Sequence, residues 1–135
     1  MACPRGQAVN NRLHGTGQGA FVRAAGQQVQ AFAARGGRIL FGTDVGYITR
    51  HDPTREYELM ADAGLGFSAI FASLTTAPAE EFGLATRRGK LAAGFDADIV
   101  VIAGDPARDI RALGQVRLTL KRGRLVYSAP VRGTP

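Results

Sequence analysis

The chain has 135 residues, a formal net charge of +6 and 45% hydrophobic residues, which suits one ordinary domain or a small domain with an appendage. No apolar run approaches the roughly 18 residues that a membrane-spanning helix needs. The single cysteine, Cys3, excludes an internal disulfide framework. We therefore expect a cytoplasmic protein with no membrane partner.

The positive charge comes mostly from arginines that are scattered singly along the chain. Only Arg87-Arg88 and Lys121-Arg122 are adjacent pairs, and no aromatic residues interleave with them to form a stacking platform for bases. This pattern favours a solvated basic surface over a nucleic-acid interface, so we expect no nucleic-acid partner.

Residues 1–20 contain little that could be buried, which predicts an irregular lead-in. A helix is predicted next, because one face carries apolar residues at three- and four-residue spacing: Val22, Ala25, Val29 and Phe32. Gly36-Gly37 is a typical helix end.

A short apolar strand is predicted at Ile39–Phe41, and it stops at Gly42-Thr43-Asp44. In a (β/α) barrel the carboxyl ends of the strands line the active site, which makes Asp44 a candidate catalytic acid. From the residues alone, the alternative is a turn or helix-capping aspartate that follows a strand.

Three helices are predicted after the loop that contains Tyr47 and His51. Asp52-Pro53 is a good start for the first of them. The second has a core face with spacing i, i+3, i+4, i+7, formed by Phe67, Ile70, Phe71 and Leu74. Thr76 can cap the third, which Gly83 ends.

The pattern changes from helical to β after Gly83. Ile99–Ile102 is a fully apolar run of strand length, and apolar and polar residues alternate over 116–121. Arg122-Gly123 is a turn that predicts a hairpin with the strand beginning near Leu125. The glycines near 89 and 94 predict turns around short strands.

An ordered set of motifs resembles the C-terminal part of the metal-dependent amidohydrolases, in particular the imidazolonepropionase and prolidase-like branch. The resemblance runs from about residue 21 to 127. It rests on Gly42-Thr43-Asp44, Glu58-Leu59-Met60, Ala63-Gly64, the run from Ser73 to Glu80, and the run Gly89-Lys90-Leu91-Ala92-Ala93-Gly94-Phe95-Asp96-Ala97-Asp98.

The resemblance implies an α/β fold, a C-terminal fragment of a (β/α)8 TIM barrel together with strands of a small β-sandwich built from both chain ends. The expected division is an irregular lead-in at 1–20, the last part of the barrel at 21–84 and a sandwich segment at 85–135. A complete barrel needs about 200 residues or more, so this chain is too short to contain one.

The resemblance also implies a role for Asp44: in the family, the aspartate after strand eight binds a divalent metal, most simply zinc, and transfers protons. Tyr47 and His51 could contact the substrate in a complete enzyme, although exposed loop residues are the alternative. The other family ligands, a His-x-His pair, a carboxylated lysine and further histidines, have no counterpart here. Zinc takes about four ligands, so we expect this chain alone to bind no metal and to be inactive.

Other polar residues are interpreted structurally. Asp96 and Asp98 straddle the start of a strand and are expected to form turns rather than to bind metal. His14 is expected to be exposed, and Cys3 has no histidine placed to activate it.

Two functions remain open at this point. The first is the C-terminal portion of an amidohydrolase that cleaves C–N bonds in a small amide, cyclic amide or dipeptide. The second is a non-enzymatic module, derived from that segment, that binds or self-associates through exposed barrel edges.

Overall fold

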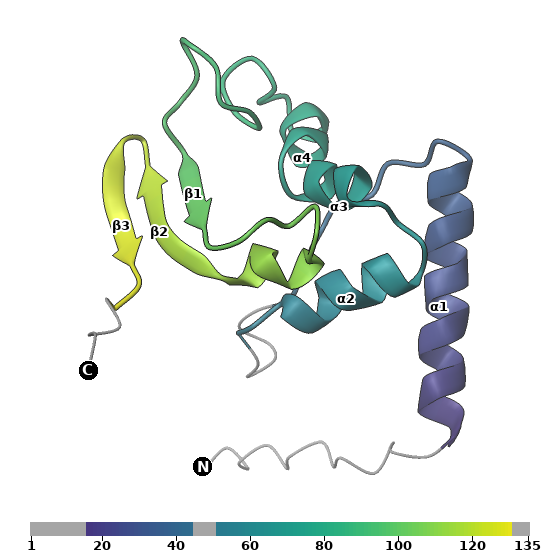
Figure 1. Ribbon diagram of the computed structural model, residues 1–135. Coiled ribbons are helices and arrows are strands. Elements are labelled where there is room, and N and C mark those ends of the chain that lie inside the picture. The colour runs from purple at the N-terminus through teal and green to yellow at the C-terminus, as the bar shows by residue number, and fades with distance from the viewer. Residues whose placement is uncertain (1–15, 45–50, 131–135) are drawn as a thin grey trace, which may run out of the picture.

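The structure is a computed structural model that describes residues 16–44 and 51–130, and its order of elements is α1, α2, α3, α4, β1, η1, β2, β3. Figure 1 shows α1 at one side of the molecule and the three-stranded sheet at the other, with α2, α3 and α4 between them. The α/β character predicted from the sequence is confirmed. No helix within the described ranges is long and apolar enough to cross a membrane.

The first helix, α1, runs from Thr16 to Ala34 and confirms the predicted amphipathic helix. It ends where expected, at Gly36, which has a φ of +79°. It begins earlier than expected, however, so residues 16–20 are helical and not part of an irregular lead-in. Residues 1–15, with Cys3 and His14, lie outside the described residues.

The predicted strand at Ile39–Phe41 is absent, which corrects the sequence interpretation: residues 37–44 form no strand. Apolar residues favour a strand only if a neighbouring strand accepts their backbone hydrogen bonds. No strand of the described chain pairs with this segment, and the Phe41 N–H donates instead to the Ser73 carbonyl at 3.1 Å.

The three predicted helices are present as α2 (Thr54–Asp62), α3 (Phe67–Leu74) and α4 (Thr76–Glu81). Asp52 lies one residue before the N-cap, Pro53, and not at the cap position that the sequence predicted; its Oδ1 still accepts hydrogen bonds from the Thr54 N–H at 2.9 Å and the Thr54 hydroxyl at 2.6 Å. The expected capping role of Thr76 is wrong, since Thr76 is the first helical residue and no side chain caps α4.

The C-terminal strands form one antiparallel sheet in the order β1 (Ile99–Ile102), β2 (Val116–Lys121), β3 (Arg124–Ser128). The predicted hairpin joins β2 to β3, and both turn residues, Arg122 and Gly123, have positive φ as in a type I′ turn. A short 3₁₀ helix, η1 (Ile110–Gly114), lies between β1 and β2. Residues 84–98 contain turns but none of the short strands expected there.

The core is a cluster of Tyr57, Leu65, Ile70 and Leu113. It joins α2 and α3 to η1, and the partly buried Ile102 of β1 packs against it, so residues on both sides of the expected boundary at 84–85 share one core. Ile70 is completely buried, as predicted, but Phe71 is 45% exposed, so its assignment to the core is wrong. Its side chain lies on the other side of α3, where a groove opens.

Candidate functional site

The segment that carries Asp44 is held in place by Phe41. The Phe41 ring packs on the Tyr57 ring with centroids 5.0 Å apart, and the Phe41 N–H bonds to the end of α3 through the Ser73 carbonyl. Burial, followed by the negative charges of Glu56 and Asp52, raises the pKa of the Tyr57 phenol above its ordinary value. The segment therefore leaves the contact between the partly buried Phe41 and the buried Tyr57 and then reaches the surface.

Asp44 lies at the exposed end of this segment and has a φ of +49°. Aspartate tolerates this left-handed conformation better than most residues do, because its short side chain can bond locally. Within the described chain, no hydrogen bond or ion pair joins Asp44 to His51, which is also exposed. Tyr47 lies outside the described residues.

The described residues around Asp44 do not fit a metal site. Within 16–44 and 51–130, no group of three or more histidine, cysteine, aspartate or glutamate side chains lies close enough together to hold an ion. A zinc site takes about four such ligands, or three with a water. Asp44 can contribute one carboxylate to a site but cannot form one.

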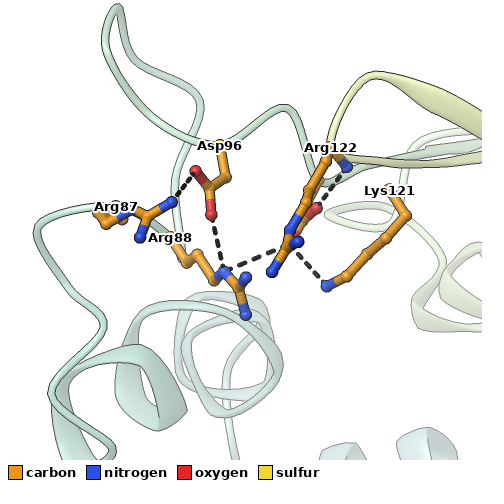
Figure 2. Close-up of polar contacts among 6 residues, drawn as sticks. Arg87, Arg88, Asp96, Lys121 and Arg122 are labelled. Carbon is orange, nitrogen blue, oxygen red and sulfur yellow. Dashed lines mark hydrogen bonds and ion pairs between the residues drawn. The ribbon is translucent and has the colours of Figure 1, made fainter.

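A second polar arrangement was not foreseen as a unit from the sequence. We call it the clasp, and it consists of Arg87, Arg88, Asp96, Asp98, Lys121 and Arg122 (Figure 2). Asp96 and Asp98 were expected to form turns, and in addition their carboxylates bind basic groups from two other segments. The sequence contained a signal for this arrangement, because the two adjacent basic pairs supply three cations (Arg87, Arg88 and Lys121) and the Arg122 N–H.

Asp96 forms the first half of the clasp. Its Oδ1 lies 2.9 Å from Arg87 Nη2, and its Oδ2 lies 3.1 Å from Arg88 Nε. The hydrogen bond from Arg87, then that from Arg88, lowers the pKa of the Asp96 carboxyl below its usual range. These contacts hold the turn at 94–98 against Arg87 and Arg88, in the segment that follows α4.

Asp98 forms the second half and connects that turn to the hairpin. Its Oδ2 accepts from Lys121 Nζ and its Oδ1 from the Arg122 N–H, both at 2.8 Å. The hydrogen bond from Lys121, then that from Arg122, lowers the pKa of the Asp98 carboxyl. Arg88 Nε, at 3.5 Å from Asp98, bridges the two halves.

Gly89, at the start of the Gly-Lys-Leu run, occupies a position where any side chain would be strained and would clash with its neighbours. Gly89 has a φ of +92°, and a Cβ placed on it would lie 2.7 Å from the Ala79 Cβ and 3.0 Å from the Thr75 carbonyl oxygen. Ala79 lies in α4, and Thr75 lies between α3 and α4. The absence of a side chain therefore lets the chain turn closely over α4 before it reaches the clasp.

We predict that Asp98→Asn destabilises the chain at neutral pH, because it removes the charge that Lys121 and the Arg122 N–H bind. A carboxyl with a lowered folded-state pKa contributes stability above its unfolded pKa of about 3.9, and this contribution is lost as the pH falls through the folded value. Urea unfolding should therefore show a difference between the variant and the native chain at pH 7 that shrinks below about pH 4.

Asp62→Asn is the matched control, since Asp62 is exposed and forms no ion pair within the described chain. It should leave stability almost unchanged. A difference for Asp98→Asn that stays constant down to pH 3 would contradict an electrostatic role for the clasp.

Comparison with known proteins gives consistent matches. Residues 6–127 match the amidohydrolase family. The structure is similar to a Xaa-Pro dipeptidase with bound methionine in the active site (TM-score 0.69, 27% identity, covering 77% of this chain and 25% of that one). It is also similar to a putative prolidase from Bifidobacterium longum (TM-score 0.67, 28% identity, covering 82% and 28%).

A sequence relative is the amidohydrolase tasK of Hapsidospora irregularis, which is 58% identical over 43 residues, or 32% of this chain and 4% of that protein. The chain spans about a quarter of the length of the two solved relatives.

Proposed function

The chain belongs to the amidohydrolase family, and from this premise we propose that it is the C-terminal portion of a metal-dependent hydrolase of C–N bonds. The proposal rests on how much of each protein matches. Almost the whole of this chain, residues 6–127, matches the family, but the chain spans only about a quarter of the length of the two solved relatives. The family predicted from the Gly89-Lys90-Leu91 run and its companions is confirmed.

In the complete enzyme we place residues 21–84 in the last part of a (β/α)8 barrel and residues 85–135 in a small β-sandwich. The shared core between α2, α3 and η1 supports a fixed arrangement of these two parts. The missing strand at 39–41 is consistent with this placement, because its neighbours would be other barrel strands.

The substrate class that we propose is a small amide, cyclic amide or dipeptide. One solved relative is a Xaa-Pro dipeptidase with bound methionine, and another is a prolidase complexed with N-methylphosphonate-L-proline. In the complete enzyme, Tyr47 and His51 follow the Asp44 segment and would lie in a loop near the substrate.

The family implies a divalent metal, and we propose zinc, which would supply an activated water in the complete enzyme. The described residues of this chain do not fit that metal, because Asp44 has no ligand group around it. We therefore assign no catalytic step to the isolated chain and propose that it is inactive alone. Asp44 would be the catalytic acid-base and metal-binding residue of the complete site.

Zinc titration of the purified chain tests this proposal. We expect no stoichiometric binding, and the same weak titration for Asp44→Asn, since a single carboxylate is not a zinc site. Tightly bound zinc at one ion per chain, or dipeptide hydrolysis by the chain alone, would overturn the proposed inactivity.

The coding sequence upstream of this segment provides a second test. An in-frame continuation that encodes a His-x-His pair and further histidines is the expected result. A stop codon close upstream would contradict the fragment interpretation.

The alternative function is a non-enzymatic module that self-associates or binds a partner. It is favoured by the exposure of large apolar side chains, including Phe21 at 74% and Leu91 at 75%. Sedimentation separates the two: a soluble, monodisperse oligomer, together with an upstream stop codon, would favour the module.

A further inference from the structure

A groove of about 850 Å³ opens between α3, α4 and the turn segment 84–98, which Figure 1 shows connecting α4 to β1. A volume of this size is within the range of small-molecule sites. Its wall is largely apolar, and much of it is accessible: Phe82 is 68% and Leu91 75% exposed. The stacked rings of Phe67 and Phe71, with centroids 5.4 Å apart, line the α3 side. Of β1 only the first two residues reach the groove, so it is formed mainly by the helices and the turn segment.

Three charged residues line the groove: Arg88, Lys90 and Asp98. Arg88 and Asp98 belong to the clasp and are paired with each other at 3.5 Å. Lys90 is exposed and lies outside the clasp, with its ammonium 5.0 Å from the centre of the Phe95 ring. Within the described chain Lys90 forms no ion pair. The groove therefore has one cation whose charge no described carboxylate matches.

Asp98 does not reverse this positive charge, because its carboxylate is already bound. Lys121 Nζ and the Arg122 N–H each donate to it at 2.8 Å (Figure 2). The clasp and Lys90 together contain five basic side chains against two carboxylates. The acidic pair of α4, at 80–81, does not line the groove and is paired with Arg38. The complementary ligand for this surface is therefore apolar along most of its length and negative at one end.

We propose that this groove binds an unbranched aliphatic carboxylate, with the alkyl chain along the apolar wall and the carboxylate at the Lys90 ammonium. Burial of methylene groups favours binding, and the ammonium favours an anionic head over a neutral or cationic one. A concave groove of this volume fits a single chain better than the flat surface of a membrane. None of these residues belongs to the Asp44 segment, so the inference goes beyond the proposed function and does not depend on it.

Titration of simple carboxylates tests the site. Hexanoate, octanoate and decanoate, each below its micellar concentration, are added to the isotope-labelled chain and followed by NMR and calorimetry. We expect one decanoate per chain, with shifts concentrated at 67–91. Each methylene that is removed should weaken binding by about two- to fourfold. Decyltrimethylammonium should bind about tenfold more weakly than decanoate.

Three results would overturn the proposal. The first is the absence of saturable decanoate binding tighter than about 1 mM. The second is equal binding of decanoate and decyltrimethylammonium. The third is co-sedimentation with phosphatidylglycerol vesicles without decanoate binding, which would indicate a membrane as the occupant.

Variants of Lys90 test the head-group contact. Lys90→Met should weaken decanoate binding by about tenfold and leave decanol binding unchanged, whereas Lys90→Arg should retain the preference for the carboxylate. Arg117→Met is the matched control, because Arg117 is exposed on β2, does not line the groove and forms no ion pair within the described chain. Equal weakening by Lys90→Met and Arg117→Met would mean that only the net charge matters, and would overturn the assignment.

A second pair of variants tests the apolar wall. Leu91→Ser should weaken decanoate binding by about tenfold, because it removes exposed apolar surface from the groove. Leu125→Ser is its control, since Leu125 is 62% exposed on β3 and does not line the groove. Equal effects of the two variants would place the alkyl chain elsewhere and overturn the inference.

These outcomes are independent of catalysis. Saturable decanoate binding that depends on Lys90, combined with a stop codon just upstream, would leave this site standing and remove the proposed function. An upstream frame encoding the metal ligands, combined with no decanoate binding, would do the reverse.

Discussion

Replacing Ile70 by alanine should lower the free energy of unfolding by about 2–5 kcal/mol, the range for truncating a large buried aliphatic side chain. Ile70 is the central residue of α3 and is completely buried among Tyr57, Leu65 and Leu113. The substitution removes buried methyl groups and leaves a cavity where α2, α3 and η1 meet. Urea unfolding followed by circular dichroism measures the loss.

Phe71→Ala is the control on the same helix. Its ring is 45% exposed and stacks on Phe67 with centroids 5.4 Å apart, so less apolar area is lost and no closed cavity forms. Its loss of stability should be clearly smaller than that of Ile70→Ala. Equal losses at the two positions would mean that α3 presents a different face to the core.

Gly89→Ala should also be strongly destabilising, for two reasons that add. A side chain at a φ of +92° costs about 1–3 kcal/mol of backbone strain. Contact of the new Cβ with the Ala79 Cβ and the Thr75 carbonyl adds an overpacking cost of about 1–3 kcal/mol. The same unfolding measurement applies.

Gly94→Ala separates the two costs. Gly94 has a similar φ of +83°, but a Cβ there would have nothing within 4 Å. Gly94→Ala should therefore lower the free energy of unfolding by the backbone-strain cost alone. If Gly89→Ala lowered the free energy of unfolding no more than Gly94→Ala does, the close approach of the turn to α4 would not contribute to the loss of stability.

Asp44 identifies the family of the chain but does not form an active site within the described residues. Gly42-Thr43-Asp44 was chosen from the sequence because a strand end with a carboxylate is typical of a catalytic face. The structure places Asp44 at an exposed position, with no group of three or more possible ligands among residues 16–44 and 51–130, and the strand before it does not form. The aspartate supports family membership, and we propose that the activity depends on ligands from the rest of a complete enzyme.

The clasp could have been predicted more fully. Two carboxylates spaced two apart, Asp96 and Asp98, and the adjacent basic pairs are all visible in the printed chain. Nothing local, however, links Asp98 to Lys121, which is 23 residues away. That contact depends on the antiparallel pairing of β2 with β1, which places Leu120 opposite Ile99 and so brings Lys121 near Asp98.

The sequence by itself determined the local elements and the family. Apolar spacing predicted α1 and α3, the pair Asp52-Pro53 predicted the start of α2, and a two-residue turn predicted the β2–β3 hairpin. These features depend on backbone preferences and on periodicity within a few residues.

Only the tertiary structure decided which apolar residues are buried and which groups distant in the chain meet. It left Ile39–Phe41 unpaired, exposed Phe71 to a groove, pressed Gly89 against α4 and joined Asp98 to the hairpin. The physical reason is that strand pairing, burial and ion pairing are set by neighbours brought together by the whole fold. The same local pattern is a buried strand beside one neighbour and an unpaired segment without it.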